Sequence, residues 1–287
     1  MTELQPDYSE IEPFELVRYL LKESGQEHIN SINPAQMLDF LKLDYEILDL
    51  DTITQEIRYL TKKSPRAVLS FSDKIIIVDS KLNENQSRFS ILHEIAHYVL
   101  PSHQKKLYVC DDKDLDISTQ YSIEKEANDF AADLLFMGDR FILDANSERI
   151  CADTVKKLAE KYKASFESTA RRLVTKNIRP CMLLVFRVIN DRYAINTNLS
   201  KKWIVHYCIS SKAFKTKYFS SARGEVPDEV VAQLTEQTRD ISDSIKTERS
   251  ITIHKTGKKS DFTVEYFYNQ YNIFALLVPK HTILNTG

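Results

Sequence analysis

Residues 1–147 combine the two periods of apolar positions that distinguish helices from strands, so we predict a mixed α/β section. Asn33 is a typical helix N-cap, and Pro34 suits the first position of the helix that follows. The run Ile75–Val78 consists only of β-branched residues and predicts a buried strand. The other elements that the pattern predicts here are a strand at Leu43–Asp51 and helices at Pro13–Glu23, Arg88–Val99 and Ser122–Met137.

The pattern changes twice after this section. Residues 148–178 show two short amphipathic helical periods and are locally basic. Residues 179–287 are rich in strand patterns, interrupted by one helix that begins at Pro227. The predicted strands are Met182–Val188, Trp203–Ile209, Ile251–His254, Phe262–Tyr268 and Ile273–Val278. We therefore predict the α+β fold class, with a domain at 1–147, a helical section at 148–178 and a second α+β domain at 179–287.

Composition and charge restrict the partners and the location. The chain has 287 residues and a net charge of −2, so no overall positive field indicates nucleic acid. The N-terminal stretch is acidic and lacks the apolar core of a signal peptide, and no apolar run approaches the roughly 18–20 residues of a membrane span. We expect a cytoplasmic protein without a membrane partner. Four cysteines without C-x-x-C spacing are expected to be buried thiols, namely Cys110, Cys151, Cys181 and Cys208.

The sequence His93-Glu94-Ile95-Ala96-His97 is an H-E-x-x-H motif on a predicted helix. Two histidines four residues apart on a helix are separated by about 40° around the axis, so both rings can reach one metal ion. Zinc accepts imidazole nitrogens, and Glu94 can take a proton from a zinc-bound water. Manganese would also fit this ligand type. The alternative interpretation is a pair of hydrogen-bonded core histidines, because the rest of this helix is apolar and buried.

The predicted helix at Ser122–Met137 offers a third ligand. At about 100° per residue, Glu124 falls on its apolar face and Glu126 on the opposite side. A carboxylate on a buried face needs a cation, so we predict Glu124 as the ligand and Glu126 as a solvated surface charge. Asn128, one turn further on, is a candidate for orienting a ligand. His103, beyond Pro101, is interpreted as a loop histidine rather than a ligand.

These motifs resemble the ImmA/IrrE family of metallopeptidases. Arg88-Phe89-Ser90 is similar to the family's R-F-[ST] lead-in, and residues 124–135 to its E-x-x-A-N-x-F-A-x-x-L-L signature. The resemblance covers roughly residues 30–140 and departs where the family often has Met-Pro, here Phe136-Met137-Gly138. It implies a zincin-like domain with His93, His97 and Glu124 as zinc ligands and Glu94 as general base.

The resemblance also implies a biological role. Members of this family typically cleave, or promote the loss of, a cognate helix-turn-helix transcriptional repressor, which controls stress, mobile-element or defence genes. Some relatives have a GAF-like ligand-sensing domain after the peptidase domain, so the resemblance implies that residues 179–287 could form one. The expected partner is therefore a protein substrate, a helix-turn-helix repressor, while the oligomeric state is left open.

Two other function classes remain as alternatives. The basic section at 153–176 is similar to the first part of a helix-turn-helix, and residues 201–217 place lysines between aromatic side chains. A DNA-binding or ligand-sensing regulator could use these regions, although solvated surfaces are the favoured interpretation of both. The other alternative is a toxin–antitoxin-type partner whose metal site does not catalyse turnover of a substrate.

Overall fold

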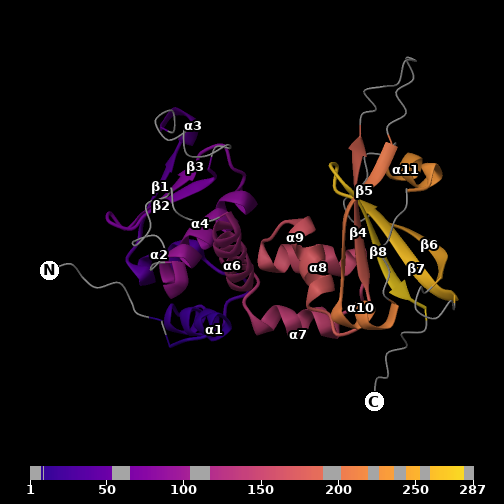
Figure 1. Ribbon diagram of the computed structural model, residues 1–287, viewed down its shortest axis with the longest axis horizontal. Coiled ribbons are helices and arrows are strands. Elements are labelled where there is room, and N and C mark those ends of the chain that lie inside the picture. Colours follow the sequence, from indigo (N-terminus) through magenta and orange to yellow (C-terminus); the bar gives the residue numbers. More distant parts are fainter. Residues whose placement is uncertain are drawn as a thin grey trace. The chain divides into compact units, whose positions relative to one another are not determined.

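Figure 1 shows the computed structural model of the chain, a mixed α+β protein as predicted. The structure describes Tyr8 and residues 10–53, 65–103, 117–189, 202–218, 226–235, 244–252 and 259–280. The chain divides into two compact units, residues 1–141 and 142–287, and in the described residues each has a sheet of its own. Within those residues, no helix combines the length and the apolar character that crossing a bilayer would need.

Two helices open the N-terminal unit, and both begin at a proline. The α1 helix spans Pro13–Glu23 and buries one apolar face, made of Leu16, Val17, Leu20 and Leu21. The α2 helix spans Pro34–Leu41. The Asn33 side chain accepts hydrogen bonds from the backbone N–H groups of Ala35 and Gln36, at 3.1 and 3.5 Å. This confirms Asn33 as the predicted N-cap.

A three-stranded sheet with the order β1-β3-β2 lies in the same unit. The strands are β1 (Asp44–Leu48), β2 (Ala67–Ser70) and β3 (Ile75–Asp79). β3 runs parallel to β1 and antiparallel to β2. It confirms the predicted buried strand, although only Ile76 and Val78 are fully buried. β2 was not predicted, because four residues are too few to show a period.

The strand predicted at Leu43–Asp51 is shorter than expected. Its last two residues, Leu50 and Asp51, belong to the short helix α3 (Leu50–Ile53). The next long helix, α4 (Glu84–Val99), packs against β2 and β3. It begins before the predicted Arg88, because Asn83 and Gln86 form a reciprocal capping box.

The α6 helix spans Ile117–Leu135 and packs against α4 and α1. It ends at Leu135, and Gly138 follows with a positive φ of 57° and donates its N–H to the carbonyl of Asp133 at 2.8 Å. The α7 helix, Asp139–Ser147, follows directly. Apolar packing between α4 and α6 therefore fixes one helix relative to the other, and the buried apolar residues of the two helices include Leu92, Ile95, Ala96, Ala127, Phe130 and Ala131.

The C-terminal unit is built on an antiparallel sheet with the order β5-β4-β8-β7-β6. Its strands are β4 (Met182–Ile189), β5 (Lys202–Ser210), β6 (Ser244–Thr252), β7 (Lys259–Tyr268) and β8 (Ile273–Pro279). The predicted strand at Ile251–His254 is the end of the longer β6, and His254 lies outside the described residues.

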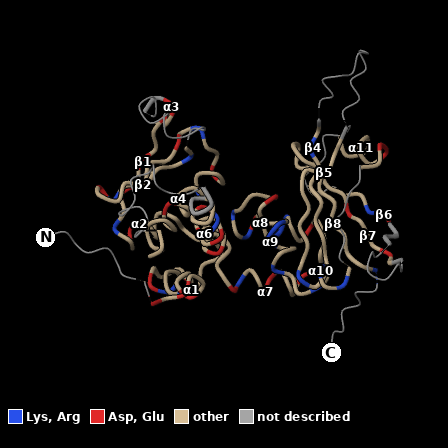
Figure 2. The backbone as a smooth tube through the Cα atoms, viewed as in Figure 1, with Lys and Arg blue, Asp and Glu red and all other residues tan. Residues whose placement is uncertain are grey.

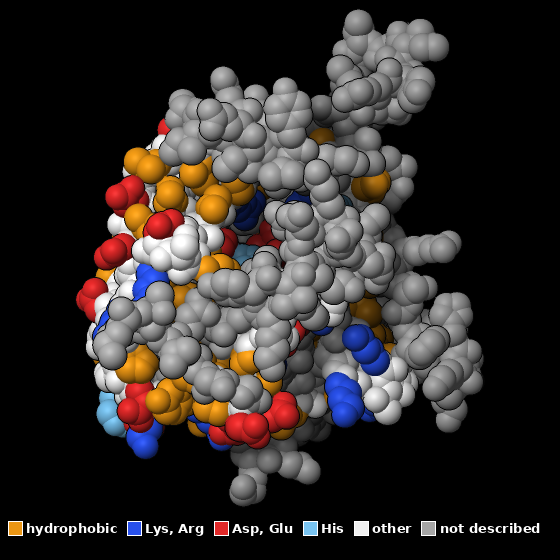
Figure 3. All heavy atoms as spheres, turned by 60° about the vertical axis from the view of Figure 1, so that its left-hand side comes forward, with side chains coloured by type: hydrophobic (Ala, Val, Ile, Leu, Met, Phe, Trp, Pro, Cys, Tyr) orange, Lys and Arg blue, Asp and Glu red, His pale blue; other side chains and the backbone are white. Residues whose placement is uncertain are grey.

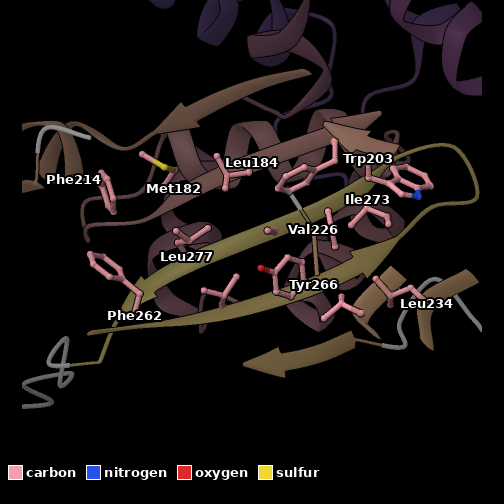
Figure 4. Packing of buried hydrophobic residues seen from close by; sticks show 14 of the residues in the cluster. Met182, Leu184, Trp203, Phe214, Val226, Leu234, Phe262, Tyr266, Ile273 and Leu277 are labelled. Atoms are coloured by element: carbon pink, nitrogen blue, oxygen red, sulfur yellow. The ribbon is translucent and has the colours of Figure 1, made fainter. Parts of the chain in front are cut away.

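Both faces of this sheet are covered. One face carries the apolar cluster of Figure 4, which α10 (Lys212–Tyr218) and α11 (Asp228–Thr235) help to form. On the other face lie α8 (Ala152–Tyr162) and α9 (Phe166–Thr175), which contact β4, β5 and β7. Central strands buried on both faces have no need of polar positions, which explains the nearly continuous apolar sequence of β8. The predicted helical section and the strands that follow it thus share one compact unit.

Two expectations for this unit were wrong. The pattern predicted one helix between the strands, but α10 precedes α11, and the Ser211 hydroxyl caps it by accepting from the N–H of Phe214. The cysteines are not uniformly buried. Cys181 is buried, and burial raises its pKa to about 12, whereas Cys208 is exposed and Cys151 half-buried. Cys110 lies outside the described residues.

A buried carboxylate connects α8 to the sheet. Glu265 of β7 is only 4% exposed, and its oxygens accept from the Ser244 hydroxyl at 2.6 Å and from the N–H of Ala152 at 3.2 Å. Ala152 is the first residue of α8, and its N-cap residue, Cys151, makes no side-chain cap bond. The strand therefore supplies the acceptor that the start of this helix lacks.

We predict that Glu265→Ala lowers the free energy of unfolding of the C-terminal unit by about 1–3 kcal/mol, because it leaves buried donors without an acceptor. Urea denaturation followed by the fluorescence of Trp203, the single tryptophan of the chain, measures the effect within this unit. Glu248→Ala is the matched control, because the Glu248 side chain is 71% exposed on the neighbouring strand. Equal midpoints for Glu265→Ala and the control would contradict the prediction.

Candidate metal centre

The candidate site is formed by two helices of the N-terminal unit. α4 carries His93, Glu94 and His97, and α6 carries Glu124. His93 and His97 lie one turn apart on α4, so their rings extend from the same face. α6 packs along α4 and brings the Glu124 carboxylate to both rings. In Figure 3, histidine and acidic side chains lie beside one another within the face that is drawn.

The candidate ligand atoms of the three residues all lie within 4.8 Å of one another. The Nε2 atoms of His93 and His97 are 3.1 Å apart, one Glu124 oxygen (Oε2) lies 3.3 Å from Nε2 of His93, and the other (Oε1) lies 3.5 Å from Nε2 of His97. A tetrahedral zinc site with bonds of 2.0–2.1 Å would separate its ligand atoms by about 3.3–3.4 Å. Two imidazole nitrogens and one carboxylate oxygen are also the ligand types that zinc prefers. The residues therefore fit a metal ion, and the described residues form one such group here.

The pKa shifts agree with a site for a cation. Burial, followed by the neighbouring His93, lowers the pKa of His97 to about 4. Burial acts on His93 in the same direction, but the hydrogen bond to Glu124 and the charge of Glu94 outweigh it, so the pKa of His93 is raised. The hydrogen bond from His93 is the main reason that the pKa of Glu124 is lowered. At neutral pH, His97 thus offers a lone pair and Glu124 a negative charge.

Glu94 has the opposite electrostatic character. Burial raises its pKa to about 7, and the charge of Glu124 acts in the same direction. A carboxyl group with this pKa exchanges protons readily at neutral pH, which suits a general acid and base. Its place next to His93 on α4 keeps it at the site without making it one of the three grouped ligands.

Three more side chains surround the ligands. Asn128 donates to the backbone carbonyl of Glu124 at 2.7 Å, so it braces the residue predicted as third ligand. The Nδ1 atom of His103 lies 2.9 Å from Nδ1 of His97, and its Nε2 atom lies 3.3 Å from an oxygen of Glu126.

These contacts correct two expectations from the sequence. His103 is fully buried rather than a loop histidine, because residues 101–103 keep a helical backbone after α4. Glu126 is partly exposed but is not simply solvated, because this segment faces the side of α6 that carries it. Figure 2 shows how acidic residues recur along α6. Helical angles alone assigned Glu126 to solvent, and only the fold reveals what faces it.

Comparisons with known proteins agree with this geometry. Residues 44–174 match the family model Peptidase_M78, described as the IrrE N-terminal-like domain. No curated protein matches the chain. The fold is similar to that of a solved structure, a Mycobacterium tuberculosis transcriptional regulator, with a TM-score of 0.52 and 14% identity. This similarity covers 96% of the present chain and 91% of that one, and at such low identity it concerns the fold alone.

We predict that Glu124→Ala removes stoichiometric metal from the protein, because two histidines remain where three ligands are needed. The loss of affinity should exceed the roughly 10–100-fold that removal of an outer partner costs. Elemental analysis after gel filtration of zinc-supplied protein measures it. Asp129→Ala is the control, since Asp129 is exposed on the same helix and paired with Lys125. Metal retained at the wild-type ratio in Glu124→Ala would exclude this residue as a ligand.

Proposed function

Residues 44–174 belong to the IrrE N-terminal-like family of peptidase-type domains, and on this premise we propose that the chain is a zinc-dependent endopeptidase that cleaves a helix-turn-helix transcriptional repressor. The observation that supports the peptidase is the group of His93, His97 and Glu124, whose nitrogen and carboxylate oxygen atoms approach one another to 3.1–3.5 Å, next to Glu94, a buried glutamate whose pKa is raised to about 7. A repressor substrate would be met in the cytoplasm, which is the location we propose.

Each residue has a distinct task in this mechanism. His93, His97 and Glu124 would hold the ion, which when bound polarises a peptide carbonyl and acidifies water. Glu94 accepts the proton from the attacking water and returns it to the leaving amine. In the metal-free protein, burial raises the pKa of Glu94 to about 7, within the range that suits a general acid and base.

Regulation of transcription is the part of the proposal that the family resemblance implies. The solved structure of similar fold belongs to a protein described as a transcriptional regulator, which supports such a role. Zinc is the ion we propose, with manganese as the second choice for the same ligands. A GAF-like sensor function for residues 179–287 stays a prediction.

The contacts of the basic helices disfavour direct DNA reading as the main function. Figure 2 shows Lys and Arg residues on α8 and α9. Lys157 and Lys161 form ion pairs with Glu148 and Asp144 within the unit. Arg172 of α9 is only 8% exposed. These three cations already have contacts within the unit, although the Lys157 side chain is 65% exposed, and a DNA-binding face built on them would compete with those contacts.

We expect Glu94→Gln to slow cleavage by about 100–10,000-fold while the metal content stays that of the wild type, because only the proton-transferring carboxylate is lost. The substrates to test are the helix-turn-helix repressors encoded beside the gene, with fragments identified by mass spectrometry. Glu84→Gln, on the exposed first turn of α4, controls for the change of charge on this helix. Undiminished cleavage by Glu94→Gln would reject the mechanism. A sequence-selective DNA shift that survives this substitution would favour the regulator alternative.

A further inference from the structure

We propose that His103 and Glu126 are positioning residues that hold His97 in the orientation and tautomer that a metal ligand requires. The chain of contacts runs from Glu126 on α6, through the buried ring of His103, to the outer nitrogen of His97. The inference rests on the proposed function only in taking His97 as a ligand, and it does not depend on proteolysis.

The distances permit one consistent placement of the ring protons. Nε2 of His97 faces Nε2 of His93 at 3.1 Å and Glu124 at 3.5 Å, so in the metal-binding form its lone pair points toward the ion. The ring proton of a neutral His97 is then on Nδ1, where it donates to Nδ1 of His103 at 2.9 Å. His103 must therefore carry its own proton on Nε2, which donates to Glu126 at 3.3 Å.

The reverse assignment is physically poor. If Glu126 did not accept from Nε2 of His103, that ring could keep its proton on Nδ1, facing His97. The proton of His97 would then move to Nε2 and occupy the direction of the metal. The Glu126 carboxylate, which only accepts, selects the tautomer of His103, and this in turn selects the tautomer of His97.

Burial makes this selection strict. The His103 side chain is fully buried, so both of its ring nitrogens need partners, and the contacts with His97 and Glu126 supply them. The Ser102 hydroxyl donates to the same Glu126 oxygen, Oε2, at 3.3 Å and so helps to hold the carboxylate in place. Glu126 also lines a pocket of about 260 Å³, so removing its carboxylate opens space that water can enter rather than a sealed cavity.

In this arrangement one additional imidazole ring, that of His103, lies between the ligand histidine and the carboxylate. Ligand histidines usually donate their outer N–H to a carboxylate or carbonyl, which raises their basicity, and loss of that partner costs about 10–100-fold in metal affinity. In this chain the carboxylate is too far from His97 for direct contact, and His103 transmits its effect. α6 would thereby support the site twice, with Glu124 at the ion and Glu126 behind His97.

The test is the zinc affinity of the full-length protein, measured at one fixed pH by competition with a chromophoric chelator. We expect His103→Ala to bind Zn²⁺ about 10–100-fold more weakly than the wild type. His103→Asn should recover much of this loss, because its side-chain oxygen can take the place of Nδ1 and accept from His97. Asp129→Ala, which removes an exposed carboxylate from the same helix, controls for long-range charge and should bind like the wild type.

A thermodynamic cycle separates positioning from a merely structural role. Glu126→Ala should weaken Zn²⁺ binding in the wild-type background but have no further effect in the His103→Ala background, because Glu126 acts through that ring. Thermal unfolding of the metal-free proteins shows whether each variant is folded. If His103→Ala does not fold, the zinc affinities of His103→Asn and Glu126→Ala still test the inference.

The outcomes distinguish the two proposals. The inference would be overturned if both His103→Ala and Glu126→Ala bound Zn²⁺ with wild-type affinity. It would also be overturned if Asp129→Ala lost as much affinity as these variants, or if the losses of His103→Ala and Glu126→Ala were fully additive in the double variant. A protein that binds Zn²⁺ as expected but cleaves no repressor would overturn the proposed function and leave the inference standing.

Discussion

An ionisable site inside an apolar helix is the constraint on which the N-terminal unit depends. The second half of α4 is largely buried, so water solvates His93, Glu94 and His97 only in part. An unpaired polar group at such a position costs free energy. The partners of the His93 and His97 rings come from α6 and from the residues directly after α4, and α4 and α6 also pack against each other. The candidate metal site and the apolar core of this unit therefore both depend on the position of α4 relative to α6.

Much of this site could be predicted from the sequence, because it depends on local helical geometry. The spacing of His93 and His97 defines a shared direction, and the helical arc of α6 selected Glu124, whose carboxylate does contact both rings. The burial expected for Glu124 was wrong, because its side chain is 51% exposed. The N-cap at Asn33 was accessible for the same reason, since a cap needs only its neighbours. The capping box of Asn83 and Gln86 also depends only on neighbouring residues, so the start of α4 at Glu84 could have been predicted from the sequence.

Other features depend on contacts between distant segments, and no local pattern reports them. β2 is too short to show a period and is defined by its pairing with β3. His103 and Glu126 are separated along the chain and meet only because residues 101–103 continue helically against α6. The helical arc separated Glu126 from Glu124, but it could not reveal that Glu126 is the less exposed of the two and contacts a buried histidine. In the C-terminal unit, β8 was predictable from its continuous apolar run, whereas α10 depends on a cap by Ser211.

The bond from Glu265 to the first turn of α8 has a consequence for how this chain can be rearranged in evolution. Phe166 at the start of α9 packs edge-on against Phe267 and Phe274 of the sheet, so the two short helices share a core with strands encoded about a hundred residues later. A recombination event with its breakpoint between α9 and β4 would separate helices from the surface they cover and leave aromatic rings exposed on both fragments. The helices at 152–175 should therefore be inherited with the sheet, and the family match at 44–174 joins the same helices to the N-terminal unit as well.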